Sequence, residues 1–175
     1  TSDIAMQGNW YPAPFHSVRS TLIADPYSNR FSQASLGYHY ADEDQRIFNL
    51  SYRYKDQPHA IDSAGEIHKQ ATDQIDGSFY LPVAAQWHIY QRTHVDITRS
   101  ELIENISGVK YEGCCWGVML AFKRERSTFD NNSRILDTAD AKYQNSWYIQ
   151  FELKGLGGVT NTISRLLEES IQGFK

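Results

Sequence analysis

The stretch Trp147-Tyr148-Ile149-Gln150-Phe151-Glu152-Leu153-Lys154 alternates between apolar and polar side chains almost throughout. Every second residue from Trp147 to Leu153 is apolar; Gln150 and Glu152 alternate with them, and Lys154 follows. Successive side chains of an extended strand point to opposite faces, so this period of two predicts a β-strand with one apolar and one polar face.

The same period of two recurs along nearly the whole chain. Eight further segments carry it: Ile4–Trp10, Val18–Ala24, Leu36–Tyr40, Phe48–Tyr54, Ile75–Leu81, Val83–Ile97, Ile103–Tyr111 and Trp116–Phe122. Together they predict about nine antiparallel strands, several of them about ten residues long. Strands of ordinary globular proteins have about 5 to 6 residues, whereas a tilted strand needs about 9 to 11 to cross a bilayer. The lengths therefore favour an all-β fold, an antiparallel transmembrane β-barrel.

The connections between these segments alternate in length. The short ones are Pro12–Pro14, Ala41–Asp44, a kink at Pro82 and Glu112–Cys115, and the longer ones include Asp56–Gln70 and Ser127–Asn145. Short turns on one rim and longer loops on the other are typical of outer-membrane barrels, whose short rim is periplasmic. Aromatic residues near the strand ends fit the girdles of such a barrel. They fit the core of a soluble β-sandwich as well, so that alternative stays open here.

Composition excludes some classes of protein. Lys and Arg number 17 against 21 Asp and Glu, which leaves a formal net charge of −4 and a pI near 5.8. No basic field for nucleic acid is present. The mean hydropathy of −0.55 and the lack of a long apolar run exclude a membrane-spanning helix, but strands with one polar face average to a polar value in any case.

The period changes after the last alternating stretch. Gly155, Gly157 and Gly158 end the strand pattern, and the apolar residues then follow helical spacing: Ile163, Leu166, Leu167, Ile171 and Phe174. We expect residues 1–156 to form the strands and residues 157–175 a short amphipathic tail helix. Its apolar stripe has three possible partners, a barrel rim, another subunit or a membrane surface. The rim is favoured because the polar face of the helix is acidic.

The two cysteines, Cys114 and Cys115, are adjacent in sequence. A bond between neighbours closes a strained ring, so a mutual disulfide is not expected. From spacing alone, two buried free thiols of a cytosolic protein are favoured over bonds to cysteines elsewhere. Neither these residues nor the six histidines have the spacing of a metal site, and no nucleophile motif occurs. We therefore expect no metal, no cofactor and no catalytic residue.

Three segments carry a family resemblance: Asn49–Lys55, Gly108–Val118 and Tyr148–Leu156. The Tyr-x-x-Cys-Cys-Trp pattern at 111–116 and Phe-Glu-Leu-Lys-Gly-Leu at 151–156 are the most specific parts. In these segments the chain resembles the C-terminal part of the LPS-assembly protein LptD family, over most of its length from about Phe31 onward. The resemblance implies a barrel of about twenty-six strands in the Gram-negative outer membrane, of which this chain would be roughly the last third.

The resemblance also implies a function and partners. The family inserts lipopolysaccharide into the outer leaflet through a lateral gate between its first and last strands. Its partners are lipopolysaccharide, the plug lipoprotein LptE, a periplasmic Lpt bridge that delivers lipid to the N-terminal domain, the barrel-assembly machinery and outer-membrane lipid. The start at Thr1 fits a piece of a longer or processed chain. The tail would then be periplasmic.

Roles for individual residues follow from the same resemblance. Cys114 and Cys115 would each bond to a cysteine of the N-terminal periplasmic region; this chain has no other cysteine, so here they are expected to be free or paired between molecules. Trp147, Ile149, Phe151 and Leu153 would face lipid on the gate strand. The expected lumen-facing residues are Arg53, Lys55, Arg92, Lys123, Gln150 and Glu152. Two alternatives are an outer-membrane barrel enzyme of lipase or protease type and a soluble ligand-binding β-barrel.

Overall fold

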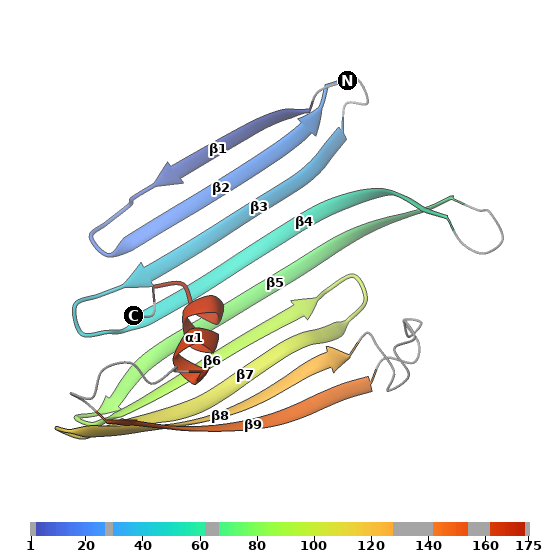
Figure 1. The fold of residues 1–175 in the computed structure, drawn as a ribbon. Coiled ribbons are helices and arrows are strands. Elements are labelled where there is room, and N and C mark those ends of the chain that lie inside the picture. The colour runs from blue at the N-terminus through green and yellow to red at the C-terminus, as the bar shows by residue number, and fades with distance from the viewer. Residues whose placement is uncertain (1–2, 27–29, 62–66, 128–141, 154–161, 174–175) are drawn as a thin grey trace.

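The computed structural model describes residues 3–26, 30–61, 67–127, 142–153 and 162–173. Nine strands form one antiparallel sheet in which each strand pairs with the next along the chain (Figure 1). The strands are β1 (Ile4–Trp10), β2 (His16–Asp25), β3 (Arg30–Ala41), β4 (Ile47–Ile61), β5 (Ile67–Ala84), β6 (Trp87–Asp96), β7 (Glu101–Glu112), β8 (Trp116–Ser127) and β9 (Lys142–Leu153). The predicted all-β class, antiparallel order and number of strands are confirmed.

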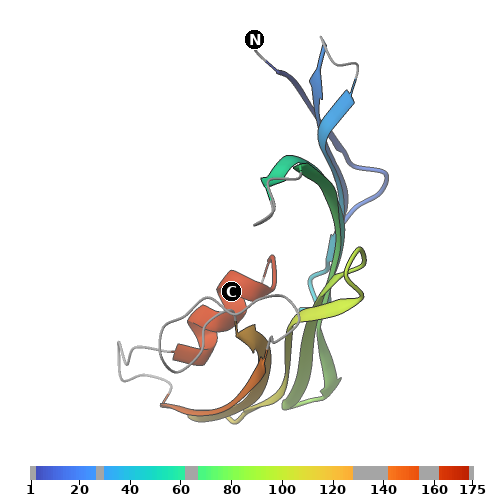
Figure 2. The same cartoon turned by 90° about the vertical axis from the view of Figure 1, so that its right-hand side faces the viewer.

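The sheet curves into an open arc, with β1 and β9 as its two edges (Figure 2). Helix α1 (Thr162–Ser170) lies on the concave side of this arc. Within the described residues, β1 and β9 do not pair with each other, so the sheet is an open arc, which is consistent with part of a barrel wall, and not a closed barrel.

The two faces of the sheet differ in polarity as the alternation predicts. On β4, Asn49, Ser51 and Arg53 share the concave face with the helix, while Leu50 and Tyr52 project from the convex face and are exposed. A soluble ligand-binding barrel buries its apolar residues inside. Here the apolar side chains are outside, which is the arrangement of a membrane barrel.

Four connections of two to five residues lie at one end of the sheet, although the β6–β7 connection at the other end, residues 97–100, is as short. The four join β1 to β2, β3 to β4, β5 to β6 and β7 to β8 at residues 11–15, 42–46, 85–86 and 113–115. In the second of these turns, the Asp42 carboxylate accepts hydrogen bonds from the Arg46 backbone N–H at 2.8 Å and the Tyr40 hydroxyl at 2.9 Å. Desolvation acts to raise the pKa of Asp42, but these hydrogen bonds and the Arg46 charge outweigh it and lower the pKa. We call this end the short rim.

The predicted kink at Pro82 is wrong. Pro82 lies within β5 opposite His88, beside a register shift, and the chain turns at residues 85–86. Alternation hides the turn because Val83, Ala85 and Trp87 keep the spacing of one long strand across it. Proline has no backbone N–H to donate to a neighbouring strand, so it is tolerated next to such an irregularity.

The predicted long loop Asp56–Gln70 is also mostly wrong. β4 continues to Ile61 and β5 begins at Ile67, so the two strands stay paired up to Ile61↔Ile67. This hairpin extends beyond its neighbours at the end of the sheet opposite the short rim (Figure 1). Its sequence carries little alternation, so the period of two could not reveal these strand ends.

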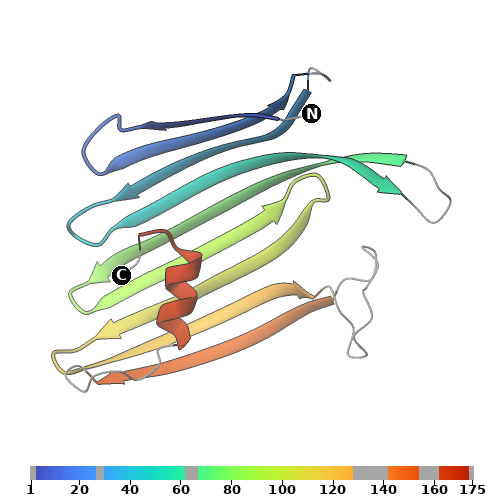
Figure 3. The same cartoon turned by 45° about the horizontal axis from the view of Figure 1, so that its top comes forward.

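The tail helix is confirmed, but its apolar stripe packs on the concave face of the sheet and not against the rim. Its residues Ile163, Leu167 and Ile171 are almost fully buried on the concave face, close to the short rim (Figures 1 and 3). They form one cluster with a residue or two from each of five successive strands: Ile47, Tyr80, Tyr90, Ile106, Met119 and Ala121. Apolar residues on the polar face of the sheet therefore serve to receive the helix.

Gly108 on β7 marks the tightest packing in this cluster. A Cβ atom there would lie 2.2 Å from the Leu120 carbonyl oxygen and 2.4 Å from the Tyr90 hydroxyl, which donates a 3.0 Å hydrogen bond to that carbonyl. We expect Gly108→Ala to lower the free energy of unfolding by about 1–3 kcal/mol, the usual cost of overpacking. Urea titration of the protein refolded in lipid vesicles measures it. Gly37→Ala is the control, since its nearest neighbours stand 3.9 Å away; equal losses would contradict the prediction.

Candidate functional site

The terminal strand β9 combines an open backbone edge with an apolar face. One side of β9 pairs with β8 from Trp116↔Leu153 to Ser127↔Lys142, and no described strand pairs with its other side. The predicted gate residues lie on the convex face and are exposed: Trp147 by 67%, Ile149 by 78%, Phe151 by 56% and Leu153 by 46%. Lipid cannot satisfy the unpaired backbone groups of this edge, so in a membrane it requires a further strand or a polar partner.

Aromatic side chains form a continuous row on the convex face near the short rim. Trp87 packs against Tyr111, Tyr111 against Trp116, and Trp116 against Phe151, with ring centroids 4.9, 4.9 and 6.1 Å apart. One residue comes from each of β6 to β9. Such a row at one level of the sheet is typical of the aromatic girdle of a membrane barrel.

The six residues predicted to line the lumen all lie on the concave face, but they do not form one site. Arg53 and Lys55 belong to β4, Arg92 to β6, Lys123 to β8, and Gln150 and Glu152 to β9. The alternation predicted that they share one face; that this face lines a lumen stays a prediction. The alternation did not identify their partners, which divide them into different roles.

Arg92 and Lys123 belong to a ladder of ion pairs across β5 to β8. Arg92 binds Asp76 through two nitrogens, the shorter contact at 2.6 Å, and Glu104 at 2.7 Å. Lys123 contacts Glu104 at 3.1 Å and Glu125 at 2.6 Å. These cations are neutralised within the wall, and removing one would leave partly buried carboxylates unpaired. Asp76, Glu104 and Glu125 were missed, although they lie on the polar parity of their strands.

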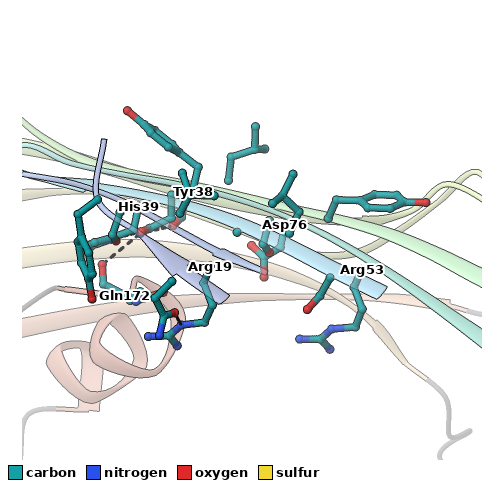
Figure 4. Close-up of a pocket in the computed structure, with 18 of the residues that line it drawn as sticks. Arg19, Tyr38, His39, Arg53, Asp76 and Gln172 are labelled. Carbon is teal, nitrogen blue, oxygen red and sulfur yellow. Dashed lines mark hydrogen bonds between the residues drawn. The ribbon is translucent and has the colours of Figure 1, made fainter. Parts of the chain in front are cut away.

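The cations of β2 and β4 are placed differently. No ion pair joins Arg53 or Lys55 to another residue that the structure describes. Arg19 on β2 donates only a 3.2 Å hydrogen bond to Asn9, as far as the described residues go. Arg19 and Arg53 border a groove of about 280 Å³ on the concave face and point to the side on which α1 lies (Figure 4). Positive charge available to an anion is therefore concentrated on these strands.

Gln150 has a structural partner that the sequence did not reveal. Its side-chain oxygen accepts a 2.7 Å hydrogen bond from the Ile163 backbone N–H in the first turn of α1. The first N–H groups of a helix have no partner within the helix, so Gln150 caps it.

Cys114 and Cys115 lie in the turn between β7 and β8 on the short rim. Both thiols are free and exposed, with their sulfur atoms 3.2 Å apart. The alternative of two buried thiols is therefore wrong. Gly113 fixes the turn through a 2.8 Å hydrogen bond from its N–H to the Trp116 carbonyl.

No helix among the described residues is long and apolar enough to cross a membrane. In the same part of the chain, no group of three or more His, Cys, Asp or Glu side chains is arranged to hold a metal ion.

Comparison with known proteins identifies the family. Residues 1–87 match the family described as LptD, LPS transport system D. An LPS-assembly protein LptD from Saccharophagus degradans is 29% identical over an alignment that covers the whole chain and 20% of the relative. The LptD of Methylococcus capsulatus is 32% identical, over 86% of this chain and 14% of the relative. The chain belongs to the LptD family.

The LptD relatives are much longer than this chain. Pseudomonas putida LptD is 29% identical over the whole chain, which again covers only 21% of the relative. The chain therefore spans about a fifth or less of the length of these relatives, in their C-terminal portion. An open arc with two unpaired edges is what a part of a larger LptD barrel wall would present.

Proposed function

We propose that the chain forms the C-terminal wall of an LptD barrel in the Gram-negative outer membrane, where lipopolysaccharide is inserted into the outer leaflet. The observation that carries the proposal is the curved sheet with a polar concave face and an exposed apolar convex face, in a chain of this family. The role is transport and assembly, and it requires no catalytic residue.

In this proposal β9 forms one side of a lateral gate, and the first strand of the whole barrel forms the other. Lipopolysaccharide must keep its sugars in a polar lumen while its acyl chains enter the membrane, so the passage needs a seam with few backbone hydrogen bonds. The open edge of β9 and its lipid-facing residues Trp147, Ile149, Phe151 and Leu153 support this placement.

The lumen wall would contact the phosphorylated sugars of the lipid on the β2 to β4 side. Arg53 and Lys55 are the proposed contacts, because no described carboxylate pairs with them. Arg92 and Lys123 are proposed to stabilise the wall through the ion-pair ladder, and Gln150 and Glu152 to face the lumen beside the gate.

The short rim is proposed to be periplasmic and to meet the other parts of the assembly. Exposed Cys114 and Cys115 would bond there to cysteines of the N-terminal domain, which receives lipid from the periplasmic Lpt bridge. Residues 1–156 would be the membrane wall, and the tail, residues 157–175, would hold α1 against the inner face of that wall near its periplasmic end. LptE as plug and the barrel-assembly machinery, which would recognise β9, complete the proposed partners.

Photo-crosslinking tests the gate. A photoreactive amino acid replaces Ile149 on β9 or, as control, Leu50 on the convex face of β4, in the full-length protein in cells. We expect pulse-labelled, newly made lipopolysaccharide to form adducts at position 149 before it does at position 50. Equal rates at the two positions would mean that lipid reaches β9 only from the surrounding membrane and would refute the gate.

A further inference from the structure

One end of the tail is attached to the terminal strand. The first turn of α1 contains no acidic residue, and the hydrogen bond from the Ile163 N–H to the Gln150 oxygen supplies an acceptor from β9. Gln150 points to the concave side, while its neighbours Ile149 and Phe151 point to the convex side. One residue of the open-edged strand thus contacts the helix directly.

The middle of the tail packs across the sheet. Ile163, Leu167 and Ile171 repeat every four residues, so they form one stripe along the helix. All three are at most 2% exposed, in a cluster that includes Ile47 of β4 and Ala121 of β8. The helix therefore packs along its whole length against the concave face of strands β4 to β8.

The other end of the tail is attached near the middle of the sheet. Asn49 on β4 donates a 3.1 Å hydrogen bond to the Gln172 carbonyl and another to Ser78 on β5, and its side-chain oxygen contacts His39 on β3. Gly173 follows with φ +92°, and a Cβ atom there would lie 2.9 Å from the His39 ring. Only glycine fits this close approach in this conformation.

We propose that α1 is an internal strap that fixes the terminal strand β9 to β3 and β4 across the concave face, with Gln150 as its positioning residue. Among the described strands β9 has a neighbour on one side only, so the strap supplies a second attachment, through the Gln150 side chain. A second claim, that the strap sets the width of the lipopolysaccharide gate, rests on the proposed function. The existence of the strap does not rest on it.

Hydrogen exchange of the full-length protein in its native complex, in lipid nanodiscs, tests the strap. Gln150→Leu removes the acceptor and keeps the size of the side chain. We expect it to raise amide exchange in β9 and in residues 162–173 by about two- to tenfold, the effect of a lost hydrogen bond, with β1 and β2 unchanged because the strap does not reach them. Gln150→Glu keeps an acceptor at the helix N-terminus, and we expect it to behave as wild type.

Two further variants keep the test decisive. Gln144→Leu makes the same change on the same face of β9, opposite Glu125 and away from the hydrogen bond to α1. Leu167→Ala weakens the helix packing without altering β9. We expect Gln144→Leu to leave β9 exchange unchanged and Leu167→Ala to raise it.

Three results would overturn the strap. They are faster exchange in the tail alone, an equal effect of Gln144→Leu, and a rise of the same size in β1 and β2. The measurement involves no lipid transport, so the gate can fail its crosslinking test while the strap passes this one, and the reverse.

Discussion

Replacement of both Cys114 and Cys115 by serine in the full-length protein is expected to abolish the proposed disulfide bonds to the N-terminal domain. We expect it also to reduce the amount of lipopolysaccharide at the cell surface severely. Both thiols are exposed in a turn on the short rim, where bonds to a periplasmic domain would form. In the chain-entropy account, a disulfide that closes a loop of about 100 residues contributes about 4.7 kcal/mol. Losing two such links would leave the lipid-receiving domain free to move relative to the wall.

Non-reducing electrophoresis and labelling of surface lipopolysaccharide measure the two effects. The matched control replaces Ala13 and Ala85, which lie in other short-rim turns, by serine. We expect this control to run and to function as wild type. Unchanged mobility of the double cysteine variant without reductant would contradict the proposed bonds, and normal surface lipopolysaccharide would contradict their importance.

The faces of the sheet could be predicted because period two is set by the backbone alone. Every predicted lumen-facing residue, Arg53 and Gln150 among them, lies on the concave side, and Ile149 lies on the convex side. Where both faces meet the same solvent, the signal is lost. The β4–β5 extension to Ile61↔Ile67 carries little alternation, and its residues were predicted as a loop.

Partners could not be predicted, because they depend on register between strands. Arg92 and Glu104 are brought together by the pairing of β6 with β7, and a register shift between His94 and Val95 alters which residues face each other. The helix position has the same origin. Its apolar stripe was read correctly, but Tyr90, Ile106 and Ala121 were not recognised as an apolar receiving surface within the polar face.

Ile149→Arg is expected to cost about 2–4 kcal/mol of folding free energy in a bilayer, the range for a cation on the lipid face near the midplane of a barrel. Ile149 lies in the middle part of β9 and is 78% exposed on the convex face, so the substitution changes little packing within the sheet. The expected loss comes from placing the charge in hydrocarbon. Urea titration of the protein refolded in phospholipid vesicles, with an unchanged slope, measures it.

Gln144→Arg is the matched control, because it adds the same charge to the same strand on the opposite face. Its cross-strand neighbour on β8 is Glu125, so the new cation meets a carboxylate and water in place of lipid. We expect a change within about 0.5 kcal/mol, as for surface substitutions in general. If the sheet is a barrel wall with lipid on its convex side, the two variants differ strongly in folding free energy. If both faces meet water, they do not. Equal stability of the two variants would therefore mean that the convex face of β9 does not contact lipid. The proposal that β9 is a lipid-facing gate strand would then be wrong.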